Sequence, residues 1–421
     1  MTDIPGGADA RGAAPSRWVS LPEHVVDSPG GLPAGFRAAG VAAGLKPSGG
    51  TDLGLLVSDT PGTVSAARFT RSGVLAAPVI LCQERCALDS LRAVVANSGN
   101  ANAATGRRGV DDAARMQGAG AMALGLDPQV VAVASTGVIG VPLPADPIIK
   151  GILAARGELS QAGNEAFGES IRTTDLFPKS AAVDVTLPGG TVRVTAQAKG
   201  AGMISPNFAT MLCFVQTDAG LAPETADLLL GVCVKRSFDR ISVDGQLSTN
   251  DTAILMASGA SGVRIEPESE DELRFGEALD AMLRRLALLI VRDGEGAKRV
   301  GRVVVNGGHE ETVATAARAV ANSPLVKAAL NGGDPNWGRI AQAVGAALPD
   351  TAPLPVDIWI EGVQVCRGGA VVPFDLPALE QAVAGEEVEY TVGLPGEGVE
   401  TEVFFSDLSH DYVTINAEYT T

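Results

Sequence analysis

The sequence predicts a layered α/β fold. Short apolar runs bounded by turns, as in buried strands, fill much of the region between residues 36 and 96. Runs with helical spacing recur along the chain, and the longest is Glu270–Val291. With 421 residues, of which 46% are hydrophobic, the chain is long enough for a sizeable core. Because strands and helices interleave irregularly, layered α/β is favoured over a doubly wound sheet.

The first half of the chain begins with residues 1–17, which are rich in Gly, Ala, Pro, Asp and Arg without a period and predict a disordered leader. The strands predicted after it are Leu53–Val57, Val64–Phe69, Val79–Cys82, Val94–Ala96, Val130–Ala134, and the hairpin Ala181–Leu187 and Thr191–Ala198. The predicted helices are Asp111–Leu126, Pro147–Gly157 and Leu159–Ile171.

The second half opens with a loop from Lys199, rich in Gly and containing Pro206, that enters a buried strand ending near Thr217. Further strands are predicted at Ala253–Ala257, Val303–Asn306, Val356–Ile360 and Val363–Cys366. Helices are predicted at Pro223–Ser237, Glu270–Val291, Thr312–Ala321, Ser323–Leu330, where Ser323 is the N-cap, and after Asp334.

Composition excludes several classes of protein. A net charge of −17 argues against nucleic acid or an anionic membrane as the main partner. No apolar run of about 18 residues and no basic-then-apolar signal is present, so we expect a cytoplasmic protein. The five cysteines are odd in number and scattered, which indicates reduced thiols. Cys82 and Cys86 lack a nearby histidine or second pair, so no metal site is predicted.

Three polar loops are candidates for chemistry: Asn97–Gly106, Ser135–Gly140 and Ile241–Thr252. A strand that ends in Ser-Thr-Gly can present backbone N–H groups and a hydroxyl together, as an oxyanion hole requires. Thr210 lies where the Gly-rich loop meets the next strand, a position that combines access with rigidity. The chain has only three histidines and none lies in a motif, so we do not expect imidazole as the catalytic base.

Taken together, these loops resemble the ornithine acetyltransferase family, also called glutamate N-acetyltransferase, of arginine biosynthesis. Lys199-Gly-Ala-Gly-Met followed by Ala209-Thr-Met-Leu and Asp334-Pro-Asn-Trp-Gly-Arg are the most specific motifs. The other matching segments are Asn97–Gly106, Ser135–Gly140, Thr173–Lys179, Ser242–Thr252, Asp293–Lys298 and Asn416–Thr421. The resemblance implies an α-β-β-α sandwich of the self-cleaving N-terminal-nucleophile kind with a smaller C-terminal α/β domain.

The resemblance also implies self-cleavage between Ala209 and Thr210. This would give an α chain that ends at 209, with its ordered part from 18, and a β chain of 210–421. Thr210 would then carry a free α-amine, whose pKa near about 7.7–8.0 suits a base at neutral pH. The hydroxyl would take the acetyl group of N-acetylornithine and pass it to glutamate, a ping-pong reaction without a metal or organic cofactor.

Further roles are implied residue by residue. Thr136 and Gly137 match the family's oxyanion pair. The substrate-binding positions match Thr174, Lys199, Thr210, Glu295, Asn416 and Thr421. Lys199 can pair with a substrate carboxylate and Glu295 with an amino group. Because the last residue, Thr421, would line the site, an extension at the C-terminus is expected to be harmful.

Several points stay open at the level of sequence. Gln246-Leu247 replaces a more usual Asp-Thr in the family, which leaves room for a different substrate or for secondary metabolism. Acetyl-CoA as a second acetyl donor is neither indicated nor excluded. An amidohydrolase on the same scaffold and an inert binding protein that does not cut itself are the competing hypotheses. By analogy with the family, we expect a dimer of αβ heterodimers or a larger assembly of αβ units.

Overall fold

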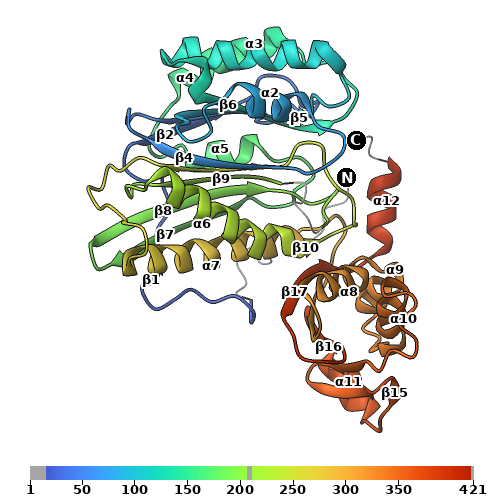
Figure 1. Ribbon diagram of the computed structural model, residues 1–421. Helices are drawn as coiled ribbons and strands as arrows, with labels where there is room; N and C mark the ends of the chain where they lie inside the picture. Colours follow the sequence, from blue (N-terminus) through green and yellow to red (C-terminus); the bar gives the residue numbers. More distant parts are fainter. Residues whose placement is uncertain (1–15, 206–210, 419–421) are drawn as a thin grey trace.

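The computed structural model describes residues 16–205 and 211–418. Residues 1–15 of the predicted leader therefore lie outside the described residues, whereas Arg17 donates hydrogen bonds to the Glu361 carboxylate at 2.9 and 2.5 Å. Two sheets lie face to face between outer helices, and a separate C-terminal domain is attached at one end of this sandwich (Figure 1). The predicted α-β-β-α sandwich with a smaller C-terminal domain is confirmed.

The larger sheet of the sandwich has six strands. In spatial order they are β1 (Val25–Asp27), β7 (Lys179–Leu187), β8 (Gly190–Lys199), β9 (Leu212–Thr217), β11 (Thr252–Ala257) and β4 (Val64–Phe69). Its outer face is covered by α6 (Pro223–Arg236) and α7 (Glu270–Arg292), with the short η2 (Phe238–Arg240) after α6. The Ser269 hydroxyl caps α7 by accepting the Glu272 N–H, and three acidic residues follow in its first turn.

The smaller sheet of the sandwich has four strands. They are β2 (Phe36–Val41), β3 (Leu53–Ser58), β5 (Ala93–Asn100) and β6 (Val131–Val138). The helices that pack with it are α2 (Ala77–Arg85), α3 (Gly106–Leu124) and α4 (Ala145–Gly157), with η1 (Pro128–Val130) leading into β6. The short α5 (Asn164–Ser170) lies between the two sheets (Figure 1), where Phe167 meets Phe214 edge-to-face at 5.4 Å.

Strand β9 shows why the sequence needs this layering. All six of its residues are buried, and successive side chains point to opposite faces. Cys213 and Val215 pack toward α6 and α7, whereas Leu212 and Phe214 pack into the core between the sheets. Both faces of an apolar strand have to be covered by other parts of the protein. The continuous apolar run of β9 therefore favours a place inside the sheet, between the outer helices and the second sheet.

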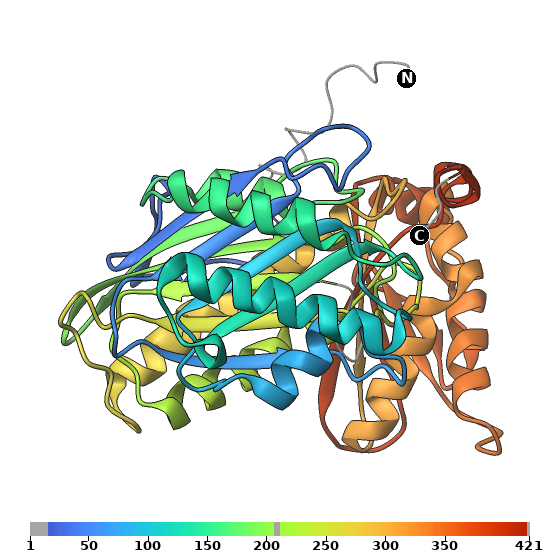
Figure 2. The same cartoon turned by 90° about the horizontal axis from the view of Figure 1, so that it is seen from above.

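The C-terminal domain is built on a mixed sheet of seven strands. In order they are β10 (Ile241–Ser242), β17 (Glu400–Ser406), β12 (Val300–Asn306), β16 (Glu387–Gly393), β13 (Asp357–Ile360), β14 (Val363–Arg367) and β15 (Ala370–Val371). Its helices are α8 (Glu310–Asn322), α9 (Pro324–Gly332), α10 (Trp337–Ala347), α11 (Leu376–Ala382) and α12 (His410–Glu418). Helix α12 runs from this domain back beside the sandwich (Figures 1 and 2).

Three predictions of secondary structure were wrong. Val79–Cys82 belongs to helix α2, not to a strand; a short apolar run fits either element, and Pro78 in the first turn favours a helix. The predicted helix Leu159–Ile171 is reduced to α5, because the Ala38 N–H pairs with the Ser160 carbonyl at 2.9 Å.

The third wrong prediction was that Asn97–Gly106 is too polar for a regular element. Strand β5 continues to Asn100, and α3 begins at Gly106. The buried Asn97 amide donates to the Asn100 carbonyl at 2.9 Å, and its oxygen accepts the Ser135 hydroxyl at 2.6 Å. Polar side chains satisfied in this way can occupy a buried strand.

Candidate active site

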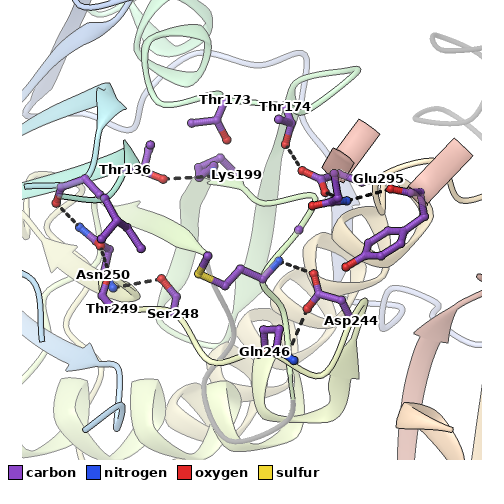
Figure 3. A pocket seen from close by; sticks show the side chains of 17 residues that line it. Thr136, Thr173, Thr174, Lys199, Asp244, Gln246, Ser248, Thr249, Asn250 and Glu295 are labelled. Atoms are coloured by element: carbon purple, nitrogen blue, oxygen red, sulfur yellow. Dashed lines mark hydrogen bonds between the residues drawn. The ribbon is translucent and has the colours of Figure 1, made fainter. Parts of the chain in front are cut away.

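A cavity of about 150 Å³ opens where one end of both sheets meets the C-terminal domain. Strands from each sheet deliver residues to it, and α12 contributes from the other side (Figure 3). The lining residues are Ala101, Thr136, Gly137, Ile139, Thr173, Thr174, Lys199, Gly202, Met203, Asp244, Gln246, Ser248, Thr249, Asn250, Glu295, Tyr412 and Asn416. The side chains in this set are mostly polar, which suits a small charged ligand.

One side of the cavity joins the ends of β6 and β8. Lys199, at the end of β8, donates from Nζ to the Thr136 hydroxyl oxygen at 3.3 Å, and both side chains are buried. Burial lowers the pKa of the Lys199 ammonium, whereas the charge of Asp175 opposes this shift. Since an ammonium only donates, the Thr136 hydroxyl is left with its own hydrogen to donate elsewhere.

Gly137 allows the two parallel strands β5 and β6 to approach closely at this point. A Cβ at residue 137 would lie 2.5 Å from the Gly99 carbonyl carbon and 2.6 Å from the Asn100 nitrogen. Its φ of 131° is also one that side chains rarely adopt. Glycine is therefore required here, and no side chain at residue 137 covers the backbone next to Thr136.

The other side of the cavity is organised around Glu295, in the loop between α7 and β12. Its Oε1 accepts the Thr174 hydroxyl at 2.9 Å, and its Oε2 accepts the Asn416 amide at 2.8 Å. The Glu295 N–H donates to the Ala201 carbonyl at 2.8 Å, which ties this loop to the chain just after β8. The Glu295 carboxylate is thus held by two separate segments, and its backbone by a third (Figure 3).

A buried ion network beneath the cavity holds these loops together. Lys179 lies 2.6 Å from both Asp175 and Asp293, and all three side chains are fully buried. Asp175 also accepts the Gly200 N–H at 2.7 Å, and Asp293 accepts the Leu176 N–H at 2.9 Å. Burial would raise the pKa of Asp175, but the charges of Lys179 and Lys199 hold it well below its usual range.

The loop between β10 and β11 supplies residues that the sequence interpretation did not single out. Asp244 accepts the Met203 N–H at 2.6 Å and the Ile204 N–H at 2.9 Å, and burial raises its pKa. Asn250 donates to the Ala101 and Ser135 carbonyls at 2.7 and 2.8 Å, which fixes the backbone just before Thr136. The signal in the sequence that could have pointed to these residues is the crowding of Asp, Ser, Thr and Asn in this loop.

The predicted site residues can now be placed. Those that line the cavity are Thr136, Gly137, Thr174, Lys199, Glu295 and Asn416. Ala209, Thr210 and Thr421 lie outside the described residues. Tyr412 on α12, which was not predicted, also lines the cavity, and burial raises the pKa of its hydroxyl to about 12. Gln246, noted only as a departure from the family pattern, faces the same space.

Within residues 16–205 and 211–418, no group of three or more His, Cys, Asp or Glu side chains is placed to hold a metal ion. No helix in the same ranges is both long and apolar enough to cross a bilayer.

Comparison with known proteins gives the family. A model of the ArgJ family matches residues 37–421. The chain belongs to the ArgJ family. The arginine biosynthesis bifunctional protein ArgJ of Symbiobacterium thermophilum is 46% identical over 393 residues, covering 92% of this chain and 98% of that protein. ArgJ of Thermus thermophilus is 46% identical over 396 residues, covering 93% of this chain and 99% of its own length.

Two solved structures are similar to parts of this chain. Ornithine acetyltransferase of Mycobacterium tuberculosis, in complex with ornithine, is 39% identical, with a TM-score of 0.40. That comparison covers 43% of this chain and 98% of the solved chain. ArgJ of Bacillus halodurans is 40% identical with the same TM-score of 0.40, covering 44% of this chain and 97% of that one.

Proposed function

We propose that this ArgJ-family chain is an acetyltransferase that moves the acetyl group of N-acetylornithine to glutamate. It becomes active by cleavage between Ala209 and Thr210, which gives an α chain ending at 209 and a β chain of 210–421. The Thr210 hydroxyl then carries the acetyl group between the two substrates, with its own α-amine as base. The observation that carries the proposal is the convergence of six predicted site residues on one cavity.

The charges of the cavity support amino-acid substrates. Burial removes water from the Lys199 ammonium and lowers its pKa. A substrate carboxylate bound there would stabilise the charged ammonium, so Lys199 is suited to bind such a group. Glu295 accepts two hydrogen bonds and keeps further acceptor capacity, so it can receive a substrate amino group. Both groups are present in ornithine and in glutamate.

The Thr136–Gly137 corner supports stabilisation of the tetrahedral intermediate. The Thr136 hydroxyl accepts from Lys199 and can donate its own hydrogen to an oxyanion. The Lys199 charge next to it favours negative charge at this corner. Loss of one such donor typically lowers kcat by about 100- to 1000-fold.

Acetyl transfer tests the reaction. Purified protein is incubated with N-acetylornithine, with and without glutamate, and ornithine, N-acetylglutamate and acetate are measured. Formation of N-acetylglutamate that depends on glutamate is the expected result. Acetate released at the same rate without glutamate would instead support the amidohydrolase. Replacing N-acetylornithine by acetyl-CoA in the same assay decides whether that donor is used.

Cleavage is tested on a denaturing gel. The wild-type protein should give two bands, and Thr210→Ala should give one uncut band. An uncut wild-type protein with full activity contradicts the acetyl-Thr210 mechanism, and an uncut inactive one supports the binding-protein alternative. We expect the cleaved protein to be cytoplasmic. We also expect it to assemble from αβ units, and light scattering at known concentration can measure the mass of that assembly.

A further inference from the structure

Lys327, in helix α9, carries a buried ammonium group that the proposed reaction does not use. The residue is only 4% exposed. Among the described residues, its Nζ donates to the Ser406 carbonyl oxygen and, at 3.3 Å, to the Ser406 hydroxyl oxygen, and it forms no ion pair. Nζ also lies 5.7 Å from the centre of the Phe405 ring. A buried charge without a direct counter-charge is costly, which indicates a role other than stabilising the fold.

Ser406, at the end of β17, lies between two loops of the active-site cavity. Its hydroxyl donates to the Val243 carbonyl at 3.3 Å, and the next residue after Val243 is Asp244. A Cβ at residue 294 would lie 3.1 Å from Cβ of Ser406 and 3.2 Å from its Oγ, so the backbone of Gly294 packs directly against Ser406. Glu295 follows Gly294. The two acidic residues of the cavity lining (Figure 3) are therefore each one residue away from a contact with Ser406.

Lys327 also fixes the chain that leads into α12. The Leu408 N–H donates to the Lys327 carbonyl at 3.2 Å. The residue between Ser406 and Leu408 is held to α9 as well, because Asp407 Oδ2 accepts the Asn331 amide at 2.6 Å. Helix α12 begins two residues after Leu408 and contributes side chains to the cavity lining. Helix α9 thus supports three parts of the cavity wall from behind.

The charge of Lys327 acts on the same wall. Burial lowers the pKa of Lys327 to about 8, although the charges of Asp407 and Asp244 act against this. Burial raises the pKa of Asp244, and the charge of Glu295 acts in the same direction. Because the attraction between Lys327 and Asp244 is mutual, the ammonium favours the ionised carboxylate. A buried cation behind the wall thus offsets the repulsion between the two carboxylates.

We propose that Lys327 is a positioning residue for substrate recognition. Through Ser406 it holds the loops that carry Asp244 and Glu295, and its charge favours two ionised carboxylates that bind a substrate ammonium group. This inference rests on the proposed amino-acid substrates. Lys327 is not among the residues that line the cavity, so it acts through these contacts and its field and not by touching the substrate.

Isothermal titration calorimetry tests this role with ornithine, norvaline, which lacks the side-chain ammonium, and δ-aminovalerate, which lacks the α-ammonium. Selectivity is the Kd of an analogue divided by the Kd of ornithine. Lys327→Met keeps a long side chain beside Phe405 but removes the charge and the donors. At least one of the two selectivities should fall by about 3- to 30-fold. A ratio of dissociation constants does not depend on the fraction of folded protein, so lower stability alone leaves it unchanged.

Matched variants separate this role from a structural one. Val344→Ala removes volume from the apolar core of the same domain, so it should lower stability and keep both selectivities within about twofold of wild type. Ser406→Ala keeps the carbonyl that accepts from Lys327 but removes the hydroxyl that donates to Val243, so it should lower the same selectivity by a smaller factor. If Lys327→Met does not fold, Ser406→Ala decides, and wild-type selectivities in that variant overturn the inference.

The outcomes also separate this inference from the proposed function. A wild-type protein that prefers ornithine to the analogues, together with Lys327→Met that keeps both selectivities, overturns only the role of Lys327. A wild-type protein that prefers ornithine but transfers no acetyl group contradicts only the proposed reaction, and the selectivities still decide the role of Lys327. A wild-type protein without any preference for ornithine contradicts recognition of an ammonium group and overturns the inference with it.

Discussion

Gly202 offers a sharp test of the Glu295 side of the cavity. A Cβ at residue 202 would lie 2.7 Å from Cδ and Oε2 of Glu295 and 2.8 Å from Oε1. The backbone of Gly202 is not in the left-handed region, so alanine is compatible with it. In Gly202→Ala the new methyl group therefore displaces the flexible Glu295 carboxylate rather than the backbone.

The size of the effect follows from the contacts that Glu295 makes. Displacement breaks its hydrogen bonds with Thr174 and Asn416 and moves the proposed acceptor for the substrate amino group. A hydrogen bond to a charged group contributes about 1.5–3 kcal/mol, so kcat/KM for N-acetylornithine should fall by about 10- to 150-fold. Stability should change by less than about 1 kcal/mol, because the moved group is not part of the apolar core.

Steady-state kinetics and urea unfolding measure the two effects. Gly118→Ala is the matched control, because a Cβ there meets nothing within 4 Å. This control should keep full activity and gain up to about 1 kcal/mol from its place inside α3. A kcat/KM for Gly202→Ala within about twofold of wild type would refute the assigned role of Glu295.

Three other outcomes are expected. Asn416→Ala removes the 2.8 Å hydrogen bond to Glu295 at an exposed position. Initial rates should therefore show KM for N-acetylornithine raised by about 3- to 10-fold. The free energy of unfolding should change little. Asp175→Asn leaves Lys179 with one buried carboxylate partner, so urea melts should show the free energy of unfolding lowered by about 3–5 kcal/mol. The control Asp59→Asn removes a carboxylate from the exposed pair with Arg37 and should lower the free energy of unfolding by at most about 1 kcal/mol. The pKa of Asp175 in the folded protein lies below the unfolded value of about 3.9. Its ionisation therefore stabilises the fold above about pH 4, and this stabilisation is lost as pH falls further. The free energy of unfolding of Asp175→Asn should depend less on pH in that acid range.

The sequence located most elements because their signals are local. Glu270–Arg292 has helical periodicity and a capping serine, and the Ser323 cap before α9 is confirmed at Val326 N–H. Val79–Cys82 was assigned wrongly because four apolar residues fit a buried strand or one face of a short helix. Pro78 favours the helix, and packing of α2 against α3 and β6 is consistent with it.

The candidate site was predictable in part for a similar reason. Thr136 and Lys199 belong to motifs that are readable along the chain. Asp244, Asn250 and Tyr412 became visible only when loops distant in sequence were brought to one cavity. Asn250, for example, acts on the Ser135 carbonyl, 115 positions earlier in the chain.

The sequence by itself determined most of the strands and helices, the family and the residues that carry local motifs, because these depend on near neighbours and on matching segments. Tertiary structure alone decided which loops share a cavity, that Lys179 joins two carboxylates, and that Asp251 is buried against Met211. The physical reason is that burial and electrostatic fields depend on distances in space, which spacing along the chain does not encode.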